Sequence, residues 1–435
     1  MDLMASSDCQ YDSLDEWIVR EAISFSLESK GTLESAVDRV VADLGDEVQL
    51  LGLGEPTHGV EAFLQFRNRL FRRLVKAHGY CAIAIESSFP RGRVVNEYVG
   101  GGDLNSGEPI SDEELWELGF SHGFGRLAAN RELIEWMRGY NGDASHVAKL
   151  RFYGFDSPTE MTVADSPRRL LEFVLDYLSG IDTASGEERR KRMEPLWGED
   201  KQWEDPAVAF DPTKGIGSSS EAIALRIETE ELITELTMRR PELVSKSGAD
   251  RFEEAARYAA LGRQMLGYHA GMARASDNRI AELLGLRDVM MADNLAYIAE
   301  RERERGRGKV LVFAHNFHLK YGEAEWQFGP QRVAWWPAGA HVGQMLGRRY
   351  AVIGMGVAVS ESHGIGQPEA GSLEARLAAG PGSGRFVPTH LGAGLPAVEL
   401  AAMPTRSVGS NPGYFPFTPR SVTDFDVLCV LNVIA

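Results

Sequence analysis

The sequence predicts an α/β fold in which a mostly parallel sheet is flanked by helices and carries a long helical insertion or lid. Two observations predict this class. Short apolar runs alternate with amphipathic stretches over most of the chain, and the alternation stops between residues 165 and 305. Strands separated by helices pair in parallel through right-handed crossovers. We therefore expect a first part of the α/β core at residues 1–164, the helical insertion at 165–305 and a second part of the core at 306–435.

The expected strands are runs rich in Val, Ile and Ala that are bounded by glycine or polar residues, which is typical of strands buried on both faces. These runs are Val48–Leu53, Cys81–Ile85, Leu150–Phe155, Lys309–Ala314, Tyr350–Gly356 and Asp426–Val433. Stretches with apolar residues at helical spacing lie between several of them. The expected helices there are Val60–Lys76, Leu127–Tyr140 and Arg287–Arg305.

The insertion is expected to consist of long helices with no strand between them. These helices are Ser166–Leu178, Glu221–Met238, Ala249–Ala275 and Asp288–Arg305. Residues 185–220 are charged, contain three prolines and end in a run of glycine and serine. A segment of this composition buries too little apolar area to order itself, so we expect a mobile loop there.

The composition excludes several classes of partner. Lys and Arg number 46 against 63 Asp and Glu, which gives a net charge of −17. A negative surface repels phosphate, so we expect no nucleic-acid partner and no membrane partner. The three cysteines have no ligand-like spacing, and an odd, sparse set fits a reducing compartment. Because no signal peptide and no apolar stretch of ~20 residues is present, we expect a cytoplasmic protein.

The first candidate for chemistry follows the first expected strand. The sequence Gly54–Gly59 places Glu55 and His58 on the turn at the carboxyl end of that strand, and in open α/β sheets ligands bind at this edge. A histidine at a helix N-terminus feels the positive end of the helix dipole, which favours its neutral form and a role as base. The alternative interpretation is structural: Thr57 caps the helix and His58 is a partly exposed turn residue.

Three further strands end in ionisable residues. Glu86 follows one strand, Asp156 follows another, and a third runs into His315 with His318 three positions later. Since the carboxyl ends of parallel strands meet at one edge, we expect these side chains to form a polar pocket.

Arg67 interrupts the apolar stripe of the first expected helix. Its neighbours at helical spacing are apolar: Phe63, Leu64, Leu70 and Phe71. A buried guanidinium is costly unless it is paired, so Arg67 is expected to meet a carboxylate or a substrate oxygen. Glu86 is the expected partner of Arg67 or of a histidine. A structural ion pair is the alternative.

Three other chemistries are less well supported. His58, His315 and His318 could ligate zinc, but the His-Glu-x-x-His helix of zinc proteases is absent, so we expect no metal. Gly119–Gly123 matches G-x-S-x-G, but the residues before Ser121 are helix-like, whereas the nucleophile elbow needs a strand. Walker A and dinucleotide-binding loops are missing, so we expect no nucleotide cofactor.

Taken together, these motifs resemble the erythromycin esterase family, which includes macrolide-inactivating esterases and succinoglycan-biosynthesis-like homologues. The matching segments are Gly54–Gly59, Arg67, Glu86-Ser87, His315–His318 and the later block with Trp335-Trp336 and His341. The resemblance implies metal-independent hydrolysis in a cleft between an α/β core and helices. It places the family's essential histidines on His58 and His315, the supporting glutamates on Glu55 and Glu86, and the arginine on Arg67.

The mechanism that we expect is hydrolysis of an ester or lactone by water. His58 would act as general base, held in its tautomer by Glu55 or Glu86. Arg67 or His315 would stabilise the oxyanion, or His315 would protonate the leaving alkoxide. The residues expected to contact the substrate are Asp156, His318, Phe120, His122, Phe317, Trp335, Trp336 and His341.

Three functions compete at this point. The first is an esterase that opens a macrolactone in detoxification or antibiotic resistance. The second is a tailoring enzyme of secondary metabolism, such as antibiotic biosynthesis, that uses the same acid and base groups for cyclisation, elimination or isomerisation. The third is a non-catalytic binding protein, which would not explain a set of costly polar groups. The expected partner is a small molecule, either a macrolide or another polyketide-like compound.

Overall fold

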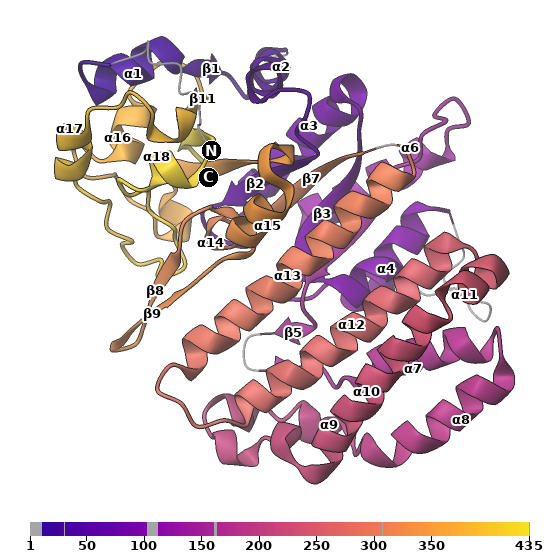
Figure 1. The fold of residues 1–435 in the computed structure, drawn as a ribbon. Helices are drawn as coiled ribbons and strands as arrows, with labels where there is room; N and C mark the ends of the chain where they lie inside the picture. Colours follow the sequence, from indigo (N-terminus) through magenta and orange to yellow (C-terminus); the bar gives the residue numbers. More distant parts are fainter. Residues whose placement is uncertain (1–10, 30, 102–111, 161–162, 307, 435) are drawn as a thin grey trace.

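The computed structural model describes residues 11–29, 31–101, 112–160, 163–306 and 308–434. Its centre is an eight-stranded sheet in the order β1-β11-β12-β10-β2-β7-β3-β4 (Figure 1). The strands are β1 (Ile23–Phe25), β2 (Leu50–Glu55), β3 (Tyr80–Ser88), β4 (Arg151–Asp156), β7 (Lys309–His315), β10 (Tyr350–Val359), β11 (Gly384–Pro388) and β12 (Val427–Val433). Two small antiparallel ribbons are separate from it: β5 (Thr159–Glu160) with β6 (Val163–Ala164), and β8 (Ala324–Phe328) with β9 (Gln331–Trp335).

The expected α/β class is confirmed. All six expected strands are present, and they form the parallel part of the sheet, from β12 to β4. The two strands that the sequence did not indicate, β1 and β11, pair antiparallel at one edge. Both are short, so neither has the long apolar run by which the six central strands are recognised.

Helices cover both faces of the sheet, because the side chains of each central strand point alternately to two separate apolar cores. One core contains α2 (Thr32–Leu44), α3 (Glu61–His78), α5 (Asp112–Leu118) and α6 (Ala128–Gly142). The other contains α1 (Leu14–Glu21), α13 (Arg279–Glu304), α15 (Ala338–Leu346), α16 (Leu373–Ala378) and α18 (Ser421–Asp424). Helix α4 (Phe89–Val99) contributes to both. The remaining short helices of the core are α14 (Asn316–Leu319) and α17 (Ala397–Ala402).

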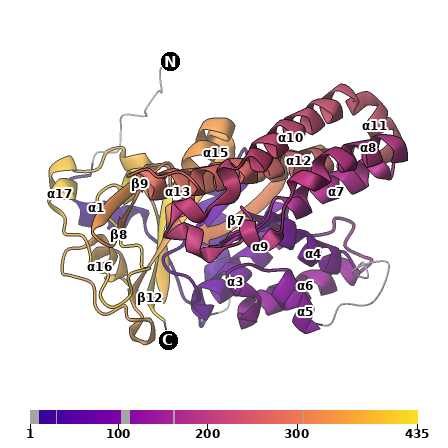
Figure 2. The ribbon, with the colours of Figure 1, turned by 90° about the horizontal axis from the view of Figure 1, so that it is seen from below.

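The expected helical segment is present between β6 and β7. Its helices are α7 (Arg168–Ser179), α8 (Thr183–Met193), α9 (Asp200–Trp203), α10 (Ser220–Met238), α11 (Arg240–Ser247), α12 (Ala249–Met272) and α13. Figure 2 shows α7, α8, α10, α11 and α12 gathered on the side of the sheet opposite to α3, α5 and α6. Helix α13 packs against both α12 and the strands β4 and β7, so it joins this bundle to the sheet.

Residues 185–220 differ from the expected loop. They form the rest of α8, helix α9 and several 3-10 turns. Met193, Trp197, Trp203 and Val208 are buried in the apolar core of the bundle. The two tryptophans are large enough to bury substantial apolar area although most of the segment is charged or polar. This burial orders a segment that its average composition predicts to be a mobile loop.

Two observations bear on the expectations from composition. No helix in the described residues combines the length and the apolar character needed to cross a membrane. Cys81 and Cys429 are buried and take part in no disulfide among the described residues, and Cys9 lies outside those residues.

Candidate active site

The carboxyl ends of four neighbouring strands bring the expected polar residues together. Glu55 at the end of β2 is the register partner of His315 at the end of β7. Glu86 lies near the end of β3, and Asp156 ends β4. All four side chains are buried, with at most 6% of their surface exposed. Residues separated by as many as 260 positions therefore lie at one edge of the sheet, because parallel strands place their carboxyl ends there.

His58 forms a close pair with Glu55 on the turn between β2 and α3. Its Nδ1 lies 2.7 Å from Oε1 of Glu55, and its Nε2 lies 3.6 Å from Oε1 of Glu86. The imidazole is 40% exposed, while both carboxylates are buried. The ring centroids of His315 and Phe124 lie 5.1 and 5.4 Å from that of His58. Buried carboxylates therefore orient the His58 ring, and the ring itself is accessible to solvent.

The charge on His58 differs from the expectation based on the helix dipole. Burial lowers the pKa of His58, but the carboxylates of Glu86 and Glu55 outweigh it and raise that pKa above its ordinary value of 6.5. Helix α3 begins only at Glu61, so His58 precedes the turn in which the dipole acts. The expected preference for the neutral form is therefore wrong, because two carboxylates are closer than the helix end.

His315 is fixed as a neutral imidazole. Its Nε2 donates to the carbonyl oxygens of Pro56 and Gly413, at 3.2 and 3.1 Å, while its Nδ1 accepts from the amide of Phe317 at 3.3 Å. Burial and the neighbouring His58 lower the pKa of His315 to about 3. Its backbone amide donates to Oε2 of Glu86 at 2.8 Å, so His315 also orients that carboxylate.

His318 is held as a cation between two carboxylates. Its Nδ1 lies 2.8 Å from Asp288 and its Nε2 lies 3.3 Å from Glu86. Burial lowers the pKa of His318, but Asp288 and Glu86 outweigh it and raise that pKa to about 10. Burial likewise raises the pKa of Glu86, and His318 and His58 more than offset this, so that Glu86 titrates well below its ordinary range.

Arg287, on α13, is the main functional residue that the sequence reading missed. Its Nε and Nη2 lie 2.9 and 2.6 Å from the two oxygens of Asp156, and Nη2 also lies 3.1 Å from Glu86. Asp156 also accepts a hydrogen bond from Nε2 of His122 at 3.0 Å. The backbone of His122 is in the left-handed region, with φ 57°. Burial raises the pKa of Asp156, but Arg287 and His122 lower it to about 2.

The signal for Arg287 was available in the sequence. Its neighbours at i−4, i−3, i+3 and i+4 are all apolar: Leu283, Leu284, Met290 and Met291. Arg67 was recognised from this same pattern. Asp288, the next residue, is completely buried and was also missed as a site residue.

Arg67 is buried as expected, but Glu86 is not its partner. Its Nε and Nη2 donate to Oδ1 of Asn68 at 3.1 and 2.7 Å, and its guanidinium lies 4.8 Å above the ring of Phe313. Burial lowers the pKa of Arg67 to about 10, and Glu55 opposes this. Among the described residues no carboxylate forms an ion pair with Arg67, and Arg287 is the arginine that contacts Glu86.

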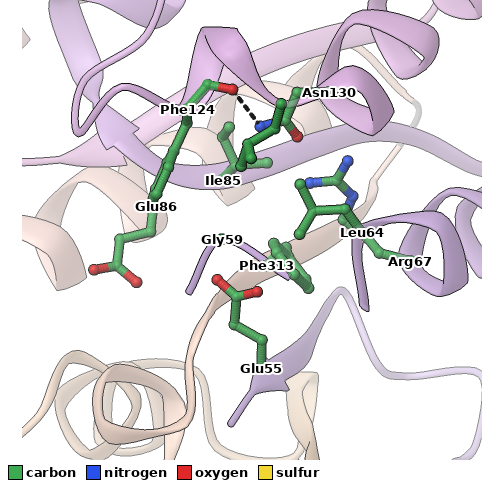
Figure 3. A pocket seen from close by; sticks show the side chains of 10 residues that line it. Glu55, Gly59, Leu64, Arg67, Ile85, Glu86, Phe124, Asn130 and Phe313 are labelled. Carbon is green, nitrogen blue, oxygen red and sulfur yellow. Dashed lines mark hydrogen bonds between the residues drawn. The ribbon is translucent and has the colours of Figure 1, made fainter. Parts of the chain in front are cut away.

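A small cavity lies beside this cluster (Figure 3). Its lining residues are Glu55, Gly59, Leu64, Arg67, Ile85, Glu86, Phe124, Leu127, Asn130 and Phe313. In Figure 3 the carboxylates of Glu55 and Glu86 lie toward one side of the view and the guanidinium of Arg67 toward the other.

Two of the aromatic residues expected to contact substrate lie in different environments, one in the apolar core and one beside His315. Phe120 is 3% exposed and packs against Trp116 and Phe152 in the core. Phe317 stacks on His315, with 5.1 Å between ring centroids, and lies next to Trp335.

A second, open groove with a volume of about 770 Å³ lies between the start of α13 and the β8–β9 ribbon. Three expected substrate-binding residues line it: Trp335, Trp336 and His341. Trp336 is 56% exposed, whereas the indole nitrogen of Trp335 donates to Oδ2 of Asp288 at 2.7 Å. Trp335 therefore connects the groove with the His318–Glu86 cluster.

Two alternative chemistries can be compared with the geometry. Within the described ranges, no group of three or more His, Cys, Asp or Glu side chains is arranged to hold a metal ion. His315 turns its nitrogens to the backbone, and His318 is protonated between carboxylates. Ser121 follows helix α5 rather than a strand, and its buried Oγ accepts from the amide of Ser88 at 2.9 Å.

The fold and the site define an α/β protein whose histidines and carboxylates converge at the carboxyl edge of a mostly parallel sheet. The family model described as erythromycin esterase matches residues 75–431, which is most of the chain. The chain belongs to the erythromycin esterase family. Membership of this family supports an esterase or hydrolase activity.

Individual relatives are distant. The erythromycin esterase type II of Escherichia coli is 23% identical over 314 residues, which is 70% of this chain and 68% of that protein. A solved Bacillus cereus protein has 16% identity and a TM-score of 0.69, with 96% of each chain covered. A solved succinoglycan biosynthesis protein has 18% identity and a TM-score of 0.68, again with 96% of each chain covered. An erythromycin esterase mutant in its open conformation has 17% identity and a TM-score of 0.64, with 95% of this chain and 97% of that chain covered.

Proposed function

We propose that the protein hydrolyses an ester or lactone bond of a small molecule, with water activated by His58. The observation that carries this proposal is the 2.7 Å contact between His58 and Glu55, beside Glu86 and at the carboxyl edge of the sheet. Glu55 fixes the tautomer of His58 by accepting from Nδ1, so that Nε2 is the atom that takes a proton from water. Proton transfer by a positioned histidine contributes typically ~10²–10⁴-fold to a rate.

The charges around His58 stabilise the imidazolium that this step forms. Two cations, Arg287 and His318, pair with three buried carboxylates, Glu86, Asp156 and Asp288. The buried carboxylate of Glu55 pairs with His58 itself. The excess negative charge is reduced when His58 gains a proton. Removal of a proton from water is thereby favoured at this position and not at the other histidines.

We assign protonation of the leaving alkoxide to His58 as well. His315 is neutral, its pKa is lowered to about 3, and both its nitrogens are bonded to the backbone, so it has no proton to release near neutral pH. The imidazolium of His58 carries the proton taken from water and can return it to the alkoxide. The oxyanion role that the resemblance suggests for Arg67 stays a prediction.

A macrolide or another polyketide-like ester is our proposed substrate class. The groove beside Trp336 and His341 is large enough for a drug-sized molecule. The relative from Escherichia coli is named an erythromycin esterase. Resistance, detoxification and biosynthesis remain alternative biological settings for the same reaction.

The raised pKa of His58 favours a second candidate function. Because its pKa is raised, the imidazole of His58 holds a proton more tightly than an ordinary histidine, and it can donate that proton to the substrate, as cyclisation, elimination or isomerisation would require. Water would then not be consumed.

Product mass distinguishes these functions. The protein is incubated with a panel of macrolides and simpler lactones, with and without a strong chelator, and the products are weighed by mass spectrometry. Hydrolysis predicts a product heavier by one water, with and without the chelator. An isobaric or dehydrated product would support the second function, and an unchanged panel would contradict both.

A further inference from the structure

The small cavity beside Glu55 contains two buried acceptors that lack a donor. Oε2 of Glu55 and Oδ1 of Asn130 have no hydrogen-bond partner among the described residues. Each residue is only 3% exposed, and both line the same cavity (Figure 3). An acceptor buried without a partner is costly, so a pair of them at one cavity indicates a missing donor.

The orientation of the Asn130 amide is fixed by its other end. Its Nδ2 donates to the carbonyl oxygen of Phe124 at 2.9 Å, the bond drawn in Figure 3. A flipped amide would set two oxygens against each other. Oδ1 is therefore the atom that lacks a partner.

Arg67 supplies the complementary group. Since Nε and Nη2 of Arg67 both donate to Asn68, its Nη1 is the nitrogen left for a further acceptor, and no described residue provides one. Arg67 lines the cavity together with the two unpartnered acceptors, Glu55 Oε2 and Asn130 Oδ1. A buried water molecule donates twice and accepts, and it makes about three hydrogen bonds on average.

The walls of the cavity are held rigidly. The carboxylate of Glu61 accepts from the amides of Ala128 and Ala129 at 2.6 and 2.9 Å, and Asn68 donates to the carbonyl of Ala129 at 2.7 Å. These bonds tie the first turn of α6, which carries Asn130, to helix α3. The space enclosed is close to the minimum that one water needs.

We propose that this cavity is a binding site for one water molecule that bridges Glu55, Asn130 and Arg67, and that Asn130 is a positioning residue acting through this water on the His58–Glu55 pair. The positioning role rests on the proposed function, whereas the water site does not. A metal cation does not fit the cavity, because it would lie against the guanidinium of Arg67.

The bridging water favours the ionised form of the buried Glu55. Burial raises the pKa of Glu55, and a donor on Oε2 counteracts this effect. Without the water, Glu55 holds the proton that it shares with His58 more tightly, and His58 loses the negative charge that supports its imidazolium.

Crystal structures of the full chain and of Asn130→Leu test the site. Leucine has a similar volume but offers no acceptor. We expect density for one water within ~3 Å of Glu55 Oε2 and Asn130 Oδ1 in the wild type, and none in Asn130→Leu. An empty cavity, a cation, or a direct Glu55–Arg67 ion pair in the wild type would overturn the proposal.

Titration of His58 by nuclear magnetic resonance tests the positioning role without any substrate. Asn130→Leu should lower the proton affinity of His58 about tenfold. Asn130→Ser replaces the amide with a hydroxyl, which can also accept a hydrogen bond, and should retain both the water and the wild-type titration. Asn141→Leu is the matched control on α6, because Asn141 bonds the backbone of Val99 and Leu150 away from the cavity.

An unchanged His58 titration in Asn130→Leu would overturn the positioning role, even with the water present. Failure to hydrolyse any ester would contradict the proposed function. The crystal structures would still decide the water site, and the His58 titration would still decide the role of Asn130.

Discussion

Arg287 donates from Nε and Nη2 to the two carboxylate oxygens of Asp156, at 2.9 and 2.6 Å. Its Nη2 also lies 3.1 Å from Oε1 of Glu86. One guanidinium on α13 therefore pairs with two carboxylates that lie at the carboxyl ends of two different strands of the sheet. Because α13 also packs against the bundle helix α12, this contact joins the helical bundle to the candidate site.

Arg287→Gln should destabilise the fold strongly, because it leaves Asp156 and Glu86 as buried charges without this cation. Removal of one partner of a buried ion pair costs typically ~3–5 kcal/mol. Urea unfolding measures the loss. Arg240→Gln removes an exposed arginine that pairs with Glu253, and it should change stability by less than ~1 kcal/mol. Equal effects of the two variants would refute the assigned role of Arg287.

Activity should rise with pH through the titration of His58. The base form is needed to accept a proton, and the carboxylates of Glu86 and Glu55 raise the pKa of His58 above 6.5, so half-maximal kcat/KM is expected above pH 6.5. Glu55→Gln removes one negative charge, which lowers the pKa of His58. The profile should move to lower pH while the maximal rate falls.

The control for this pH profile is Glu187→Gln, which alters an exposed glutamate on α8. It should leave the profile in place. A profile of Glu55→Gln that keeps the wild-type midpoint would mean that Glu55 does not set the charge state of His58.

Stability should decline in alkaline solution as His318 loses its proton. The folded protein raises the pKa of His318 to about 10, from 6.5 in the unfolded chain, so the bound proton stabilises the fold fully below pH 6.5. This contribution is lost as the pH rises toward 10. Urea midpoints measured across this range should fall, and His318→Gln should flatten the decline. A His318→Gln variant with the wild-type slope would rule this proton out as the cause.

Gly54→Ala tests the close packing at the end of β2. A Cβ atom at this position would lie 2.1 Å from Oδ1 of the buried Asn316, whose Nδ2 donates to Met355. Overpacking of this kind costs ~1–3 kcal/mol, measured as a lower midpoint of unfolding. Gly139→Ala is the control, because Gly139 lies on α6 with open space around it and alanine favours a helix. Wild-type stability of Gly54→Ala would show that β2 and α14 are not so closely packed.

The sequence was sufficient to predict the six parallel strands of the central sheet and the polar residues that share its carboxyl edge. Glu55, Glu86, Asp156 and His315 each follow an uninterrupted apolar run, and parallel pairing then requires that they share one edge. The positions of α3, α6, α7, α10 and α12 were predicted for the same reason, since apolar spacing is a local property. The start of α13 and the helices α1, α2, α4, α8 and α15 were not predicted.

The side-chain partners within the site could not be predicted, because they depend on contacts between residues far apart in the sequence. Nothing local to Arg67 or Arg287 shows which of them contacts Glu86, because the choice is made by the packing of α3 and α13 on opposite faces of the sheet. Likewise, Trp335 reads as a substrate-binding aromatic in the sequence, but its indole donates to Asp288 in the fold.

The most direct test of the account is hydrolysis in water labelled with oxygen-18, with the wild type and His58→Gln compared on the same ester. We predict one labelled oxygen in the carboxylate product of the wild type, and a kcat at least ~10²-fold lower for His58→Gln with KM little changed. His390→Gln, at an exposed histidine, should behave as the wild type. An unlabelled product, or a His58→Gln variant with wild-type kcat, would contradict the claim that His58 activates the attacking water.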